Sequence, residues 1–159
     1  MRTGLILCLL FFITTNKTDH EWTKYVSNMT DLHCLALNLY HEARGEPFDG
    51  IIAVGMVTLN RVRSAAYPNT ICDVVWEKQW SKRYKRFIAE FSWTLDSLSD
   101  IPQEQHAWQK STEIANQLLN GQYPNPMKQA TNYHADYVSP AWSKKLTFIK
   151  QIGLHRFYY

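Results

Sequence analysis

The 159-residue sequence lacks the short patterns that mark several large enzyme classes. It has no G-x-S-x-G motif, which excludes the usual serine nucleophile of α/β hydrolases, and no glycine-rich phosphate-binding loop. His41-Glu42 begins like the H-E-x-x-H motif of zinc proteases, but Gly45 stands where the second histidine belongs. No metal-ligand spacing is found among His33, His41, His106, His134 and His155. We therefore expect no metal and no other cofactor.

Long apolar segments and dense basic blocks are also scarce. Beyond residues 1–15, no segment is apolar enough to cross a bilayer. The net charge is +3, and the one basic run, residues 82–86, is less dense than nucleic-acid-binding patches usually are. We expect no nucleic-acid partner and interpret this run as a solvated loop. An anionic polymer such as the bacterial cell wall would suit a weak positive charge.

The N-terminus has the pattern of an export signal. Arg2 precedes an apolar run of signal-peptide length within residues 1–15. The cleavage site is poor, so an uncleaved N-terminal anchor is the alternative. The polar residues 16–30 are typical of a linker, and residues 31–159 are expected to form a single domain. The predicted location is outside the cytoplasm, in the periplasm, the cell wall or the medium.

Only three cysteines are present, and one of them, Cys8, lies in the predicted signal. The other two, Cys34 and Cys72, form an even count in an oxidising compartment, which predicts one disulfide. That bridge would close a loop of about 38 residues and contribute about 3–4 kcal/mol. The alternatives are two buried thiols, or Cys34 as a nucleophile with His134 or His155.

A helix that ends in a carboxylate is the central feature of the sequence. Leu32, Leu35 and Leu39 recur at helical spacing, and Glu42 continues the same stripe. Gly45-Glu46-Pro47 then ends the helix, because proline cannot continue its hydrogen bonds. Glu42 is therefore predicted in the last turn, pointing toward the core.

Two interpretations of Glu42 remain open at this point. Desolvation and the negative end of the helix dipole both raise the pKa of a half-buried carboxyl. A Glu that stays protonated near neutral pH can act as a general acid. Alternatively, Arg44 or Arg61 holds Glu42 in a buried ion pair.

A second helix is predicted over residues 49–63, where Gly55 permits close approach of a neighbour and Asn60 lies within reach of Glu42. Residues 71–76 fit either a strand or one helical turn. The helical and strand patterns are lost over residues 77–99, which predicts an irregular segment. Its aromatic side chains could stack on sugar rings or simply pack; they are Trp76, Trp80, Tyr84, Phe87, Phe91 and Trp93.

The last part of the chain changes its period. A helix is predicted to begin directly after Asp100, which caps it, with Pro102 in its first turn and Asn120-Gly121 at its end. Residues 146–150 and 154–159 then form two β-prone runs around Gly153, which predicts a hairpin. The predicted fold class is α+β, mainly helical, with a small C-terminal antiparallel sheet.

Several separate motifs together resemble one family. They are Leu35-Ala-Leu-Asn-Leu-Tyr-His-Glu-Ala-Arg-Gly-Glu-Pro47, Gly50-Ile-Ile-Ala-Val-Gly-Met-Val-Thr-Leu-Asn-Arg-Val62, Phe91-Ser-Trp93, Tyr133-His-Ala135, Pro140-Ala-Trp142 and Ile152-Gly-Leu-His-Arg-Phe-Tyr158. In this order they resemble the SleB-type cell-wall hydrolases, which include spore-cortex-lytic enzymes and phage lysins. The resemblance covers residues 31–158, although residues 77–90 are more basic than the family's usual Gln-Phe-Ser stretch.

The resemblance implies a lysozyme-like or resuscitation-factor-like catalytic domain acting on peptidoglycan glycan strands. It implies that Glu42 is catalytic, in the manner of a lytic transglycosylase. Four residues are expected to bind the glycan or to pack beside it: Trp93, Tyr133, His134 and His155.

Other residues near Glu42 have less defined roles. Glu46 and Asp136 are candidates for a second carboxylate, although Glu46 more simply caps or pairs locally. Arg44 and Asn60 are expected to support Glu42 from behind. Two other functions remain open: a zinc amidase that cuts the stem peptide, and a non-catalytic wall-binding module. We expect a monomer.

Overall fold

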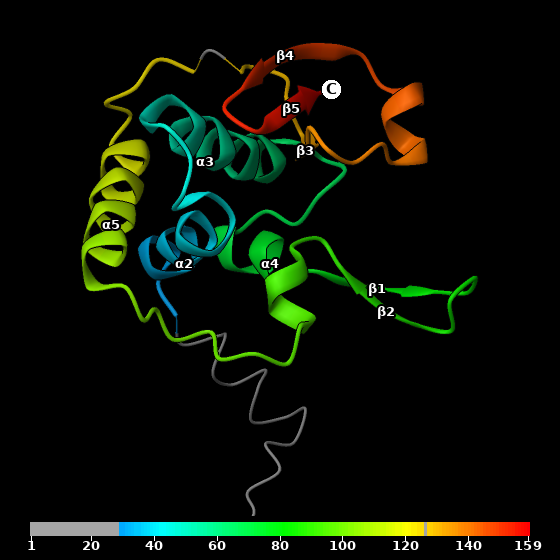
Figure 1. Ribbon diagram of the computed structural model, residues 1–159, viewed down its shortest axis with the longest axis horizontal. Helices are drawn as coiled ribbons and strands as arrows, with labels where there is room; N and C mark the ends of the chain where they lie inside the picture. The colour runs from blue at the N-terminus through cyan, green and yellow to red at the C-terminus, as the bar shows by residue number, and fades with distance from the viewer. Residues whose placement is uncertain (1–28, 126) are drawn as a thin grey trace, which may run out of the picture.

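The computed structural model describes residues 29–125 and 127–159 (Figure 1). The predicted signal and all but two residues of the predicted linker lie outside the described residues. The described elements are α2 (Asp31–Ala43), α3 (Phe48–Arg63), α4 (Ile71–Val75), β1 (Lys78–Ser81), β2 (Arg86–Ala89), η1 (Ser92–Leu95), α5 (Gln105–Leu119), β3 (Asn132–Ala135), η2 (Ala141–Lys145), β4 (Phe148–Ile152) and β5 (His155–Tyr158). This is the predicted α+β class, helix-rich with small antiparallel sheets. Among the described helices, none has the length and apolar character needed to span a bilayer.

Helix α2 is the centre of the core. Its N-cap, Thr30, accepts a hydrogen bond from the His33 amide at 3.2 Å, which satisfies one of the free N–H groups of the first turn. Every residue from Cys34 to Tyr40 is buried, so the helix is enclosed on more sides than its predicted stripe indicates. Helices α3, α4 and α5 pack around it. Glu42 follows this buried run in the last turn, as predicted.

Helix α3 begins one residue before the predicted start and lies close to α5. Gly55 makes this approach possible. A Cβ at this position would lie 2.5 Å from Leu118 Cδ1 on α5 and 3.2 Å from Leu39 Cδ2 on α2. The prediction of a close neighbour at Gly55 is therefore confirmed.

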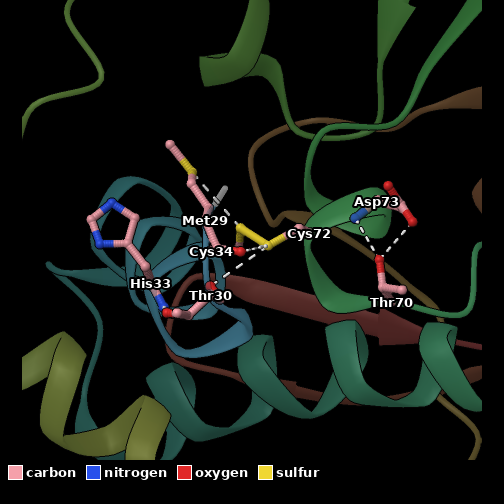
Figure 2. The surroundings of a disulfide bond; sticks show 7 residues. All are labelled: Met29, Thr30, His33, Cys34, Thr70, Cys72 and Asp73. Carbon is pink, nitrogen blue, oxygen red and sulfur yellow. Dashed lines mark hydrogen bonds between the residues drawn. A yellow bond between two sulfur atoms is a disulfide. The ribbon is translucent and has the colours of Figure 1, made fainter. Parts of the chain in front are cut away.

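Residues 71–75 form a short helix, so the prediction of a helical turn is confirmed and the alternative of a strand is wrong. The Thr70 side chain caps it by accepting from the Asp73 amide at 3.1 Å (Figure 2). The predicted disulfide between Cys34 and Cys72 is present and joins α4 to the first turn of α2, with a Cα–Cα distance of 5.2 Å. The bridge therefore holds in place the helix that carries Glu42.

The prediction of an irregular segment over residues 77–99 is wrong. Strands β1 and β2 form an antiparallel hairpin in which Trp80 pairs with Phe87, and η1 follows it. The turn includes Lys85 in a left-handed conformation (φ 51°). Most residues of both strands are exposed. Neither strand therefore has the alternation of polar and apolar residues that is typical of a half-buried strand. Figure 1 shows the hairpin projecting away from α5 and the other long helices.

Helix α5 starts at Gln105 with Glu104 as its N-cap, later than the start directly after Asp100 that the sequence predicts. The Tyr40 hydroxyl on α2 explains the delay, because it accepts hydrogen bonds from the amides of both Gln103 and Glu104, at 3.0 and 3.1 Å. This contact holds the chain in an extended entry to the helix. The predicted end is confirmed, since Gly121 adopts a left-handed conformation (φ 68°) just after the helix.

The C-terminal residues form a three-stranded antiparallel sheet in the order β3–β5–β4. The predicted hairpin around Gly153 is confirmed (φ 56°). On β3, Tyr133 pairs with Phe157 of β5. Tyr159 lies beyond β5 and is 48% exposed. The sheet places Tyr133 against the end of α2.

Candidate active site

A cleft of about 470 Å³ lies beside the C-terminal end of α2. Glu42 of α2, Arg61 of α3 and His155 of β5 line it together with residues from two other parts of the chain. One part is residues 89–92, which connect β2 to η1, and the other is β3 with the loop that follows it. Segments that are far apart in the sequence therefore meet around Glu42.

Among the described residues, one side chain donates a hydrogen bond to the Glu42 carboxyl. The Tyr133 hydroxyl donates to Glu42 Oε2 at 2.9 Å. Burial raises the pKa of Glu42, while this hydrogen bond and the charge of Arg61 lower it in part. Burial and the adjacent Glu42 carboxyl raise the pKa of Tyr133 well above its ordinary value, so Tyr133 stays a neutral donor. The arrangement favours a carboxyl that holds its proton more tightly than a solvated Glu.

Each of the two arginines expected as an ion-pair partner of Glu42 is instead paired with another carboxylate. Arg44 Nε lies 2.8 Å from Glu104 Oε1, where both side chains are exposed. Arg44 therefore points away from the cleft, and its predicted role beside Glu42 is wrong.

Arg61 is buried and is held on several sides. Its Nε donates to the Thr131 carbonyl at 2.7 Å, and its Nη1 lies 3.3 Å from Glu90 Oε2. The rings of Tyr67 and Phe91 flank the guanidinium, each centroid 5.1 Å from Cζ. Glu90 thus balances a positive charge that would otherwise act on Glu42 without compensation.

Tyr133 and His155 are next to each other at the cleft. Their ring centroids lie 5.0 Å apart in an edge-to-face arrangement. His155 Nδ1 is buried without a hydrogen-bond partner among the described residues and lies 3.7 Å from Glu46 Oε1. Burial lowers the pKa of His155, with Glu46 and Asp136 acting against it and His134 adding to it. His155 is therefore mainly neutral at neutral pH and supports the Tyr133 ring.

His134 also lines the cleft, but both of its ring nitrogens already have protein partners. Nδ1 lies 2.8 Å from the Ala135 carbonyl and Nε2 lies 3.0 Å from the Tyr158 hydroxyl. Its ring stacks on that of Tyr158, with the centroids 5.2 Å apart. His134 therefore presents a fixed ring face and edge to the cleft rather than a free nitrogen.

Trp93 lies in the core instead of on the cleft wall, contrary to the expectation that it contacts the glycan. It is 6% exposed, and its Nε1 donates to Asn38 Oδ1 at 3.1 Å. The short helix η1 turns the indole inward, where it stacks on His41 with ring centroids 4.5 Å apart. Trp93 thus supports His41, which does line the cleft.

Neither carboxylate predicted as a second acid lines the cleft. Glu46 is 9% exposed, and its Oε2 accepts from the Leu154 amide at 3.0 Å, which ties the α2–α3 turn to the β4–β5 turn. Asp136 is exposed and accepts from Gln151 Nε2 at 3.1 Å. Glu46 therefore has a local structural role, which is the simpler of its two predicted roles.

Asn60 holds the chain before β3, and its side-chain hydrogen bonds go to that segment and not to Glu42. Its Nδ2 donates to the carbonyls of Met127 and Ala130, at 2.6 and 2.9 Å. Its Oδ1 accepts from Asn125 Nδ2 at 2.8 Å. The expected reach to Glu42 is wrong, but these bonds fix the segment that leads to Tyr133.

The cleft residues that the sequence analysis does not name as site candidates include His41, Glu90 and Tyr137. His41 precedes Glu42 and was considered only as a metal ligand, and Glu90 directly precedes the Phe91-Ser92-Trp93 motif. The position of each residue beside a recognised motif is a signal in the sequence that could identify it as a site candidate. Tyr137 follows the Tyr133–Ala135 motif in an exposed loop, and no local pattern marks it. Within residues 29–125 and 127–159, no group of three His, Cys, Asp or Glu side chains could hold a metal ion.

Comparisons with known proteins agree with the motifs. The profile of the Cell Wall Hydrolase family matches residues 45–158 and begins just after Glu42. The spore cortex-lytic enzyme of Oceanobacillus iheyensis is 32% identical over 131 residues, which make up 82% of this chain and 42% of that protein. The enzyme of the same name from Halalkalibacterium halodurans is 30% identical over 80% of this chain and 34% of that protein. The chain spans less than half the length of these curated relatives.

Two solved structures are similar in fold. The catalytic domain of the Bacillus cereus SleB protein has a TM-score of 0.58 and 30% identity, covering 81% of this chain and 89% of that one. The catalytic domain of the germination-specific lytic transglycosylase SleB from Bacillus anthracis has a TM-score of 0.56 and 31% identity, covering 81% and 93%. The profile, the relatives and the folds agree, and the chain belongs to the SleB-type cell wall hydrolase family.

Proposed function

We propose that this chain degrades peptidoglycan by cleaving the β-1,4 bond between N-acetylmuramic acid and N-acetylglucosamine. Its relatives are named spore cortex-lytic enzymes, and one similar structure is described as a lytic transglycosylase. The feature of this chain that supports the proposal is Glu42, a carboxyl with a raised pKa in a cleft, held by a neutral phenol. We further propose that the reaction is a transglycosylation with Glu42 as its single acid and base.

In the first step, Glu42 acts as a general acid. It donates its proton to the glycosidic oxygen as the bond from that oxygen to C1 of the muramic acid breaks. The proton leaves with the N-acetylglucosamine, and Glu42 becomes a carboxylate. The Tyr133 hydroxyl, 2.9 Å from Oε2, stabilises the new charge.

In the second step, the same carboxylate acts as a base. It takes the proton from the C6 hydroxyl of the muramic acid, whose oxygen bonds to C1 and closes a 1,6-anhydro ring. Glu42 regains its proton and no water is consumed. Because the nucleophile belongs to the substrate, proximity replaces a second carboxylate.

The two carboxylates of the cleft have different partners, and this difference favours transglycosylation over a hydrolysis that uses two carboxylates. Retaining and inverting glycosidases place two carboxyl groups across the bond. The cleft of this chain has Glu42 and Glu90, and Glu90 lies 3.3 Å from the buried guanidinium of Arg61. Glu90 is thus engaged in balancing Arg61, while Glu42 is the carboxyl suited to exchange a proton.

The test is loss of turbidity of purified cell walls. Wild-type protein is expected to clear the walls, and Glu42→Gln is expected to leave them intact while keeping the wild-type circular dichroism spectrum. Clearing that is lost with a chelator would support the zinc amidase instead. Absence of clearing by wild type, with retention on the walls, would support the non-catalytic wall-binding module.

The proposal places the protein outside the cytoplasm, where peptidoglycan lies, with glycan strands as its partner. The disulfide between Cys34 and Cys72 agrees with an oxidising compartment. Cell fractionation that recovers the protein with the periplasm, the wall or the medium would support this location. Recovery only from the cytoplasm would contradict it.

A further inference from the structure

The β1–β2 hairpin is exposed on both of its faces. Trp80 and Phe87 face each other across the two strands, with ring centroids 5.2 Å apart, and are 55% and 57% exposed. Tyr84 in the turn is 59% exposed. Large exposed aromatic clusters of this kind usually mark interaction sites.

The net positive charge of the hairpin is larger than that of the whole chain. Residues 78–89 contain five Lys or Arg side chains and no Asp or Glu. The whole chain is only +3, so the other residues together are −2. The turn itself, residues 82–85, holds three of these cations. The positive charge is therefore concentrated on one projecting element, which suits an anionic partner.

The hairpin is continuous with the wall of the cleft. Strand β2 ends at Ala89, and residues 89–92 line the cleft beside Glu42. Four strand residues extend about 13 Å. A linear polymer that leaves the cleft along this wall would meet the aromatic pair first and the cationic turn next.

We propose that the β1–β2 hairpin is an accessory binding site for the same peptidoglycan strand, outside the bond-cleaving cleft. This inference rests on the proposed function. Sugar rings offer apolar C–H faces to Trp80 and Phe87. The stem peptides carry free carboxylates at regular intervals along the glycan, and these bind the cations of the turn. Peptidoglycan supplies both chemistries, and a strand bound beside Glu42 would reach residues 89–92 at the base of the hairpin.

The experiment measures binding of the full chain to insoluble peptidoglycan sacculi. All proteins carry Glu42→Gln, so that cleavage does not remove the substrate. The test variant is Lys82→Gln with Lys85→Gln, at two exposed positions of the turn. The matched control is Lys110→Gln with Lys128→Gln, which removes the same charge from α5 and from the α5–β3 segment. Trp80→Ala with Phe87→Ala forms a second test variant.

The Lys82/Lys85 variant is expected to bind sacculi about two- to tenfold more weakly, because exposed ion pairs contribute modestly. Its binding should also depend less on salt, while the control matches the parent protein. The Trp80/Phe87 variant should lose affinity and keep the salt dependence of the parent. Equal binding by the hairpin variants and the control would overturn the proposal. Equal or stronger retention of the parent on vesicles of phosphatidylglycerol and phosphatidylcholine would overturn it in favour of a membrane surface.

A second measurement separates this proposal from the proposed function. With Glu42 restored, the Lys82/Lys85 variant should cleave short glycans without stem peptides at the wild-type rate and clear sacculi more slowly. If wild type cleaves both and the hairpin variants do the same at wild-type rates, the accessory site is wrong and the enzyme remains. If wild type cleaves neither, the proposed function itself is wrong.

Discussion

The hydroxyl of Tyr133 donates to Glu42 Oε2 across 2.9 Å, between residues that are 91 positions apart. This bond joins the last turn of α2 to the first strand of the C-terminal sheet. Within the described part of the chain, the other oxygen of Glu42 accepts no hydrogen bond, which leaves it for the substrate. The geometry of the acid therefore depends on correct docking of the sheet against the central helix.

Replacement of Tyr133 by Phe should move the pH dependence of activity upward. The hydroxyl lowers the pKa of Glu42 in part, so its removal raises that pKa further. An acid with a higher pKa stays protonated to higher pH, and the basic limb of the kcat/KM profile should shift in that direction. The rate itself should fall about two- to tenfold, as expected for one hydrogen bond. A pH-rate series on purified walls checks this, and a downward shift would contradict it.

Glu90→Gln should shift the same limb in the opposite direction. The substitution leaves the charge of Arg61 without its partner at 3.3 Å, and a positive charge near Glu42 lowers the pKa of Glu42. The limb should therefore move to lower pH while activity below it persists. Glu104→Gln is the matched control, since it breaks the exposed pair with Arg44 outside the cleft. Complete loss of activity in Glu90→Gln at every pH would instead indicate a second catalytic carboxylate.

Glu42→Gln should stabilise the folded protein at neutral pH. The folded-state pKa of Glu42 lies above its unfolded value because of burial. Below the unfolded pKa, both states are protonated and ionisation of Glu42 imposes no cost. As pH rises through the folded pKa, the native state must either keep the proton or bury a charge, so the wild type loses stability. Gln cannot ionise.

Thermal unfolding at about pH 4, below the ordinary pKa of Glu, and at about pH 8, well above that ordinary pKa, tests the sign. The melting temperature of Glu42→Gln should exceed that of wild type at the higher pH, and the difference should shrink at the lower pH. A variant that is less stable than wild type at both values would mean that Glu42 contributes structural contacts that Gln cannot replace.

Gly153→Ala should be the most damaging of the glycine-to-alanine substitutions in turns. A Cβ at this position would lie 1.9 Å from Glu46 Oε2, and the backbone is left-handed (φ 56°). We expect a loss of roughly 1–3 kcal/mol from backbone strain alone, with displacement of Glu46 adding to it. Gly121→Ala isolates the strain, because Gly121 is also left-handed (φ 68°) and has open space around it. Urea unfolding compares the two variants, and equal losses would show that the contact with Glu46 is unimportant.

Local signals in the sequence were sufficient for the elements nearest to Glu42. The leucine stripe and the Gly45-Glu46-Pro47 stop predict the helix and the position of Glu42 in its last turn. The cysteine count predicts the bridge between Cys34 and Cys72, and Gly153 predicts the C-terminal hairpin. These signals depend on residues close in sequence, or on two cysteines that have no other cysteine to pair with outside the predicted signal.

The features that were mispredicted depend on distant contacts or lack a local pattern. The start of α5 depends on the Tyr40 hydroxyl, more than sixty residues away. The burial of Trp93 depends on the direction in which η1 leaves the hairpin. The pairing of Arg61 with Glu90 is set by the tertiary fold. The β1–β2 hairpin is exposed on both faces, and it therefore shows no periodicity at all.

The most direct test of the single-acid mechanism is mass spectrometry of the fragments that wild-type protein releases from purified peptidoglycan. The single-acid mechanism predicts muropeptides that end in 1,6-anhydro-N-acetylmuramic acid, carry no added water and resist reduction by borohydride. Fragments that carry one added water and are reduced by borohydride would contradict it, and would assign to this cleft a hydrolysis in which water, not the C6 hydroxyl, attacks C1.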